Sequence, residues 1–269
     1  EFTSAESAKL FPRGLGEVTN EGLRRAAQQG ALFKKRYREL GLLSEQTNDS
    51  EIFVRSSPVN RTLMSAAAFS ASFIGTFSYA NHIFYSLSAL QAALAEVENS
   101  RVRLDSALKK CARGDARKIQ YRSLTIGMGV DFDEDLARAS IGPLMSIVSR
   151  NVDDAVRSDL IEGMEQGPAV RIYYTHDHAL LAAARALGIL EEYDGRSPAS
   201  ASAIAIETWS SSDGFDIKIV LKDGLKNPFK TVAKFRFLEF KRRISSFAAM
   251  DHHAVQWDSN ATKVKSFVK

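Results

Sequence analysis

A histidine and an aspartate stand side by side in the second half of the chain, at His176-Asp177. An imidazole beside a carboxyl group offers a cation for an anionic ligand and a group that can donate a proton. The pair follows an apolar, β-branched run at residues 170–174 and precedes an Ala/Leu-rich helical pattern at 179–187. In an open α/β sheet, the end of such a strand lies at the carboxyl edge, where ligands bind. The sequence therefore predicts an anion site at His176 and Asp177.

A second strand far upstream also ends in a charged residue. The strand-like residues 51–55 end at Arg55, and a helix begins near Asn60. In isolation, an arginine at this position is most simply interpreted as half of an ordinary ion pair or as a strand cap. Taken singly, each of these residues has a structural interpretation: Arg55 as half of an ion pair, His176 as an edge histidine and Asp177 as a helix N-cap. Together they favour an oxyanion site.

These segments occur in an order that resembles a known family, the histidine acid phosphatases. This is the acid-phosphatase and phytase branch of the histidine phosphatase superfamily. Its members show Gly-x-Leu-Thr-x-x-Gly before a helix, then Val-Arg-Ser-x-x-x-x-Arg-Thr-x-x-Ser-Ala, then a late His-Asp. Residues 16–22 and 54–66 match the first two blocks, with Val18 in place of the leucine, and His176-Asp177 matches the third. The resemblance extends from about residue 11 to about residue 209.

The resemblance implies an activity and a role for each matching residue. The family hydrolyses phosphate monoesters at acidic pH through a phosphohistidine and without a metal, so no cofactor is expected. Arg55 matches the phosphate-binding arginine, His176 the phosphate-binding histidine and Asp177 the proton donor to the leaving alcohol. Arg61 matches a family arginine that we expect to be structural. The expected ligand is a small phosphate monoester or inorganic phosphate.

The nucleophile of the family has no counterpart in the printed sequence. It is the histidine of an Arg-His-Gly-x-Arg-x-Pro motif on the first strand, whereas the first histidine here is His82. We therefore expect the chain as given to be inactive or severely impaired, as a fragment or as a divergent member. His82 has an apolar setting typical of packing, and His252-His253 lack a third metal ligand at suitable spacing. A non-catalytic binder of phosphate esters (a pseudophosphatase) and a scaffold without a pocket are the alternatives.

The composition is that of an ordinary globular protein. The 269 residues are 45% hydrophobic and 25% charged, with a net charge of +4. A small positive excess favours anionic ligands and does not require nucleic acid, which we do not expect as a partner. No apolar run approaches the ~18 residues of a membrane span. A homodimer is left open.

The compartment is not fixed by the sequence. Cys111 is the only cysteine, so no intrachain disulfide can form. This favours a reducing compartment or a fold that is stable without bridges, and it keeps a cytoplasmic location open. The resemblance implies a secreted or lysosomal protein instead. Sequons occur at Asn48, Asn60 and Asn260, but short sequons arise easily by chance.

The expected fold class is α/β, with a central, mostly parallel sheet, helices on both faces and an inserted, reduced helical cap. Residues 1–65 and 169–269 are predicted to form a discontinuous core, and residues 66–168 the cap. Residues 229–247 mix phenylalanines with lysines and arginines, and this pattern is compatible with either a helix or a strand. Such a mixture could form a surface that binds membranes or single-stranded nucleic acid. Phenylalanines in the core with their charged neighbours in solvent fit the pattern better. Further helices are expected at 19–40, 60–73, 133–148 and 152–164, and strands at 202–209 and 215–221.

Overall fold

The computed structural model describes residues 16–44, 51–74, 118, 121–122, 125, 134–162, 164 and 167–248. His82, Cys111, His252-His253, Asn48 and Asn260 lie outside these residues, as does most of the expected cap at 66–168, so the predicted division into domains stays a prediction. The helices and strands are, in chain order, α2 (Asn20–Glu39), β1 (Ile52–Ser56), α3 (Asn60–Phe73), α7 (Glu134–Leu160), β2 (Val170–Tyr174), α8 (Asp177–Leu187), β3 (Ala203–Ser211), β4 (Gly214–Lys222), β5 (Lys230–Arg236) and α9 (Phe237–Ser245).

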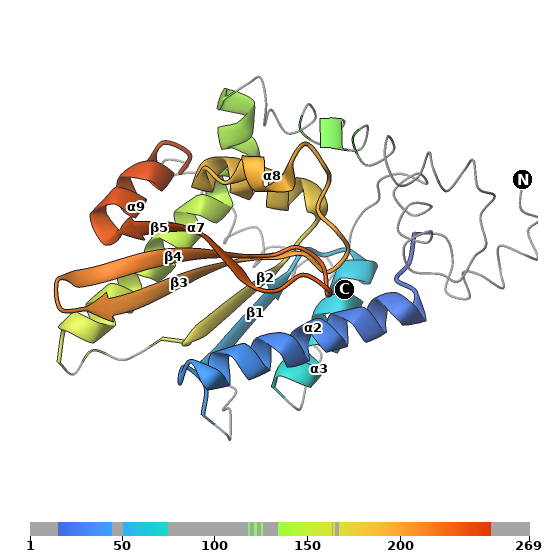
Figure 1. The fold of residues 1–269 in the computed structure, drawn as a ribbon, viewed down its shortest axis with the longest axis horizontal. Coiled ribbons are helices and arrows are strands. Elements are labelled where there is room, and N and C mark those ends of the chain that lie inside the picture. The colour runs from blue at the N-terminus through green and yellow to red at the C-terminus, as the bar shows by residue number, and fades with distance from the viewer. Residues whose placement is uncertain are drawn as a thin grey trace, which may run out of the picture.

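The described strands form two sheets between two layers of helices. β1 and β2 pair in parallel, and β3, β4 and β5 form an antiparallel sheet in that order. Figure 1 shows α2 and α3 on one side of the strands and α8 and α9 on the other. The predicted α/β class is confirmed, with the parallel pairing seen in β1–β2 and antiparallel pairing in the other three described strands.

Helix α2 begins where the sequence predicts, because Thr19 caps it. The Thr19 Oγ1 accepts a hydrogen bond from the Gly22 N–H at 3.0 Å, which satisfies one of the donors left over at a helix start. Farther along, α2 crosses α3 closely at Gly30. A Cβ atom there would lie 2.3 Å from the carbonyl oxygen of Phe69, so only glycine fits this crossing.

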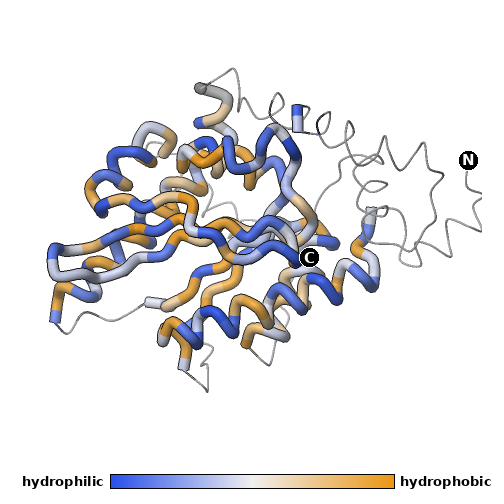
Figure 2. Tube along the Cα trace, in the orientation of Figure 1, coloured by the Kyte–Doolittle hydropathy of each residue, from blue (hydrophilic) through white to orange (hydrophobic). Residues whose placement is uncertain are grey.

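Two aromatic and aliphatic clusters hold the layers together. Under β1, β2 and the start of β3, side chains of α2 and α3 form a cluster that includes Phe33, Phe69 and Phe73. On the other side, α8 and α9 pack on β4 through Leu187, Ile219, Phe240 and others, which are fully buried. Figure 2 shows apolar residues gathered on the strands and on the helix faces that cover them.

Two expectations about the second half of the chain are settled by the structure. Residues 229–247 contain both a strand and a helix, β5 and α9, with Phe240 buried and the charged residues at the surface. The helices predicted at 133–148 and 152–164 are one helix, α7, which continues through Pro143. The Asn151 side chain in the predicted break donates a hydrogen bond to the Tyr173 hydroxyl at 2.7 Å, which ties this part of α7 to β2. No helix of the described residues has the length and apolarity needed to cross a bilayer.

Candidate active site

The parallel pairing of β1 and β2 brings the ends of both strands together. Ser56 lies opposite Tyr174, and the next residue, Ser57, donates its backbone N–H to the Tyr174 carbonyl at 2.9 Å. The chain after β2 turns at His176, and α8 begins at Asp177. Residues that are more than a hundred positions apart in sequence therefore meet at the carboxyl edge of the β1–β2 pair, as the sequence predicts.

A small polar cluster stands at this edge. The Ser57 Oγ and the His176 Nε2 lie 3.2 Å apart, within hydrogen-bond distance. The rings of His176 and His178 stack with centroids 5.2 Å apart. The Asp177 Oδ1 accepts a hydrogen bond from the His178 N–H at 2.9 Å and lies 3.6 Å from the His178 Nδ1. One hydroxyl, two imidazoles and one carboxylate thus form a connected group.

Asp177 is the first residue of α8, one position later than the N-cap role considered for it. The N-cap is His176, and no side chain caps the helix. A carboxylate in the first turn is stabilised by the helix dipole. The side chain of Asp177 is 27% exposed, so part of the carboxylate is accessible from the cavity.

His176 and Asp177 face a large cavity. Its volume is about 1350 Å³, and it is bordered by α2, α3, α7, α8 and the strands β2 and β3. Its lining includes Gly16, Thr19, Arg61, His176 and Asp177. Arg61 bonds to the Gly16 carbonyl and acts on the charge of His176, so the turn before α2, the first turn of α3 and the start of α8 lie together in the cavity wall.

The two arginines singled out from the sequence differ in position. Arg61 lines the cavity, donates a hydrogen bond to the Gly16 carbonyl at 3.5 Å and influences the charge of His176. Arg55 lies half-buried on β1, opposite Tyr173, and is not among the residues that line the cavity. Sequence reasoning gave Arg61 a structural part only. Arg61 and Arg55 belong to the same matched motif, residues 54–66, and this shared motif is the signal from which a second candidate cation could have been predicted.

The cluster controls the protonation of its own members. Burial lowers the pKa of His176 below its ordinary value of 6.5, and the neighbouring His178 and Arg61 lower it further, against the opposite effect of Asp177. Burial raises the pKa of Asp177, but hydrogen bonds from His178 and the charge of both imidazoles outweigh this, so that its pKa lies below 3.8. Asp177 is therefore a carboxylate at neutral pH, and protonation of His176 requires acidic pH.

A bound oxyanion would shift both groups in the useful direction. Negative charge next to His176 favours the imidazolium, and negative charge next to Asp177 favours the carboxylic acid. The carboxylic acid is the form that can protonate a leaving alcohol. Among the residues that the structure describes, no group of three His, Cys, Asp or Glu side chains is placed to hold a metal ion.

Comparisons with known proteins bear on this arrangement. Residues 4–123 match the sequence model of the histidine phosphatase superfamily (branch 2). The chain is 39% identical over 62 residues to the testicular acid phosphatase of Mus musculus, and 45% identical over 68 residues to the putative acid phosphatase 5 of Caenorhabditis elegans. These matches agree with the resemblance to the histidine acid phosphatases drawn from the sequence. The matched regions make up 23% and 25% of this chain, and only 14% and 16% of those two relatives.

Solved structures of phytases have a similar fold. The structure resembles the apo form of the Hafnia alvei phytase with a TM-score of 0.60 at 12% identity, over 93% of each chain. It resembles the Klebsiella sp. ASR1 phytase with a TM-score of 0.54 at 14% identity, over 91% of this chain and 92% of that one. At this level of identity the likeness extends to the fold alone.

Proposed function

We propose that this chain binds small phosphate monoesters in a site of the histidine acid phosphatase type. One observation carries the proposal: His176, Asp177 and Arg61 lie together in the wall of a large cavity, at the carboxyl edge of the β1–β2 pair. Two cations and one acid around a cavity suit an ester whose charge lies on one phosphoryl group. The resemblance to the histidine acid phosphatases supports the same ligand class.

Each residue has a part in this proposal. His176, when protonated, and Arg61 bind phosphoryl oxygens, and Asp177 gives a proton to the departing alcohol. Arg55 is assigned to phosphate binding through the family motif, from its place on β1 beside the site. In an intact site of this family type, these groups act together with a nucleophilic histidine. The reaction there is hydrolysis of a phosphate monoester through a phosphohistidine.

The nucleophile sets the level of activity that we expect. The printed sequence has no histidine before His82, and the histidines among the described residues are His176 and His178. Both belong to the cluster that binds the anion and orients Asp177. We therefore propose that this chain binds phosphate esters but hydrolyses them slowly or not at all. A non-catalytic phosphate-ester binding protein, a pseudophosphatase, is the second candidate, and the same observation favours it.

The cellular location of the protein is proposed from its relatives. The chain is 39% identical over 66 residues to a protein of Xenopus laevis named lysosomal acid phosphatase. The matched region makes up 24% of this chain and 15% of that protein. We propose a secreted or lysosomal location by this likeness.

Binding and turnover can be measured separately. We expect inorganic phosphate to bind the chain at pH 5, as followed by calorimetry, and His176→Ala to weaken this binding at least tenfold. Hydrolysis of p-nitrophenyl phosphate at the same pH reports turnover. Binding without turnover supports the phosphate-ester binding protein, and turnover lost in Asp177→Asn supports the phosphatase. Absence of binding to the native chain rejects both.

A further inference from the structure

The serine that follows β1 meets the histidine that follows β2. The Ser57 Oγ lies 3.2 Å from the His176 Nε2, within hydrogen-bond distance. His176 lines the large cavity, whereas Ser57 is not among the described residues that line it. The Ser57 hydroxyl therefore contacts the histidine without itself standing in the wall of the cavity where the anion is proposed to bind.

The backbone on both sides of this contact is fixed. The Ser57 N–H donates to the Tyr174 carbonyl at 2.9 Å, and Pro58 restricts the residue before it to extended conformations. His176 is also extended, with φ −113° and ψ 166°, and its carbonyl accepts a hydrogen bond from the Leu180 N–H at 3.1 Å. Two short side chains that start from fixed positions meet in a narrow range of geometries, so the fold itself sets this contact.

The Ser57 hydroxyl does not serve the helix that follows it. The N-cap of α3 is Val59, and no side chain makes a capping hydrogen bond there. The neighbouring serine is used differently, because the Ser56 Oγ donates to the Ser57 carbonyl at 3.0 Å. Of these two adjacent serines, Ser56 therefore supports the backbone and Ser57 supports the imidazole of His176.

We propose that Ser57 is a positioning residue for His176: its hydroxyl binds Nε2 and thereby leaves Nδ1 as the ring nitrogen that donates to the oxyanion. A hydrogen bond at one nitrogen of an imidazole fixes the ring and the role of the other nitrogen. Both nitrogens carry a proton in the imidazolium, so the Ser57 hydroxyl accepts from Nε2–H and Nδ1–H stays available for a ligand. Among the described residues, the His176 Nδ1 has no hydrogen-bond partner of its own.

The same contact affects the charge of the histidine. Burial, then His178 of α8 and Arg61 of α3, lower the pKa of His176, whereas Asp177 raises it. A hydrogen bond from an ionised donor is roughly twice as strong as one between neutral groups, so the Ser57 hydroxyl favours the imidazolium over the neutral ring. Ser57 therefore acts with Asp177 to make His176 a cation at acidic pH. This inference rests on the phosphate-ester site proposed above and adds the residue that orients its titrating cation.

Nitrogen NMR of the full chain with labelled histidine rings tests this role, with sulfate as the probe. At pH 5 we expect sulfate to shift the Nδ1–H signal of His176 and to leave its Nε2–H signal nearly unchanged. In Ser57→Ala both nitrogens should respond, and sulfate should bind about threefold more weakly. Ser57→Thr keeps a hydroxyl and should restore the native pattern, and the matched control Ser56→Ala should not alter it. A larger response of Nε2 than of Nδ1 in the native chain overturns the proposal.

The pH dependence of sulfate affinity separates positioning from other roles of the serine. Without the bond to the imidazolium, the rise of affinity on acidification should occur about half a pH unit lower in Ser57→Ala than in the native chain. An equal loss of affinity at every pH would make Ser57 a direct ligand of the anion, and an unchanged profile would give it no role, so either result overturns the proposal.

The two proposals fail in different ways. If the native chain binds no sulfate, or if His176→Ala binds it as the native chain does, the phosphate site fails and this inference fails with it. If sulfate binding requires His176 but Ser57→Ala behaves as the native chain does, only this inference fails. Circular dichroism confirms that the variants fold, and the NMR response of the native chain tests the role of Nδ1 in any case.

Discussion

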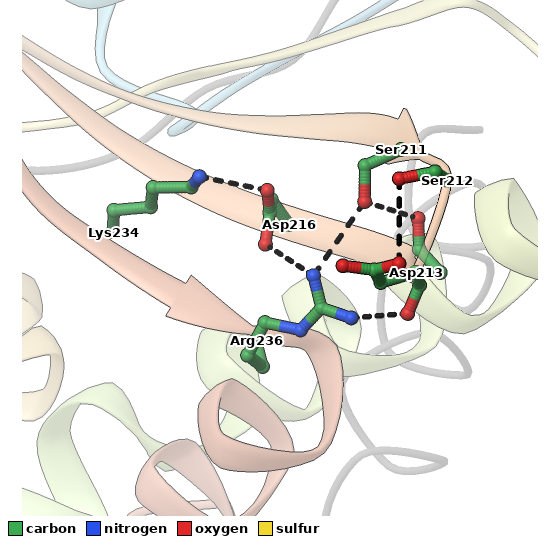
Figure 3. A network of polar contacts seen from close by, with 7 residues as sticks. Ser211, Ser212, Asp213, Asp216, Lys234 and Arg236 are labelled. Atoms are coloured by element: carbon green, nitrogen blue, oxygen red, sulfur yellow. Dashed lines mark hydrogen bonds and ion pairs between the residues drawn. The ribbon is translucent and has the colours of Figure 1, made fainter.

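The two sheets of this protein differ in what they contribute. The antiparallel sheet has long strands, with β3 and β4 paired along their whole length, and Ile217 and Ile219 of its central strand β4 are fully inaccessible to solvent. Its hairpin end carries an ionic network in which Asp216 binds Lys234 at 2.8 Å and Arg236 at 3.1 Å, as Figure 3 shows. Arg236 also donates to the Asp213 carbonyl. We therefore expect this sheet to contribute most of the folding stability.

The β1–β2 pair is shorter and is built differently. Its strands are five residues each, and most of their residues are only half-buried. At its carboxyl edge stand His176 and Asp177, whose protonation is shifted by burial and by each other. The comparison teaches that stability and chemistry depend on different parts of the fold, so substitutions in one part should leave the other intact.

The largest expected effect is on stability, in the antiparallel sheet. Ile219→Ala removes buried methyl groups and leaves a cavity, so we expect the free energy of unfolding to fall by about 3 kcal/mol. Urea denaturation measures the change. The matched variant Leu238→Ala, at a position 67% exposed, should change it by about 0.5 kcal/mol or less. An equal loss in both variants would mean that β4 is not the centre of stability.

The next effect concerns the helices that support β1 and β2. Alanine in an exposed helix is normally more stable than glycine by about 0.5–1 kcal/mol. In Gly30→Ala, however, the new Cβ meets the Phe69 carbonyl, and we expect a net loss of about 1–3 kcal/mol. Gln28→Ala, two residues away on the exposed face of α2, serves as the control. If Gly30→Ala raised the free energy of unfolding, α2 and α3 would have to move apart at this crossing without loss of stability, which would contradict the account.

A third substitution should act on binding and leave stability nearly unchanged. Asp177→Asn removes a negative charge that repels the anion, so phosphate at pH 7 should bind roughly tenfold more tightly, about 1.4 kcal/mol. Asp154→Asn makes the same change in net charge at an exposed part of the cavity lining and should have little effect. Weaker binding in Asp177→Asn would instead make Asp177 an acceptor for a protonated ligand.

The smallest effect is expected at the hairpin network. Hydrogen bonds from Lys234 and Arg236, with their charges, hold the pKa of Asp216 below 3.8 in the folded state. Its contribution to stability is therefore present above that pH and is lost as the pH falls through the lowered pKa. Asp216→Asn should lower the melting temperature slightly at pH 7, and the difference should shrink as the pH falls below 3.8. A difference that does not shrink with falling pH would point to a role of side-chain shape and not of charge.

Local signals in the sequence predicted much of this structure. Thr19 and its acidic neighbour Glu21 mark the start of α2, and the apolar runs at 52–56 and 170–174, each followed by a polar turn, mark β1 and β2. The position of His176-Asp177 at a strand end followed from the same reasoning. These features depend on neighbours in the chain, which a sequence displays directly.

Features set by distant contacts were harder to predict. The α7 helix continues past residue 148 because Asn151 binds Tyr173, and Lys241 of α9 binds Asp153 at 2.5 Å. The shift from strand to helix at residue 237 depends on Phe240 and Ile244 reaching the core under β4. The approach of Arg61 to His176 likewise requires the α3 turn and the β2 turn to meet, which no local pattern specifies.

The central claim, that His176 is the titrating cation of an oxyanion site, has a direct test. Calorimetric titration with sulfate from pH 7.5 to pH 5 keeps the charge of the ligand constant. Because the pKa of His176 lies below 6.5, we predict that sulfate affinity rises as the pH falls below that value. In His178→Ala the rise should occur at higher pH, and in His176→Ala it should be absent. The same rise in His176→Ala as in the native chain would contradict the account.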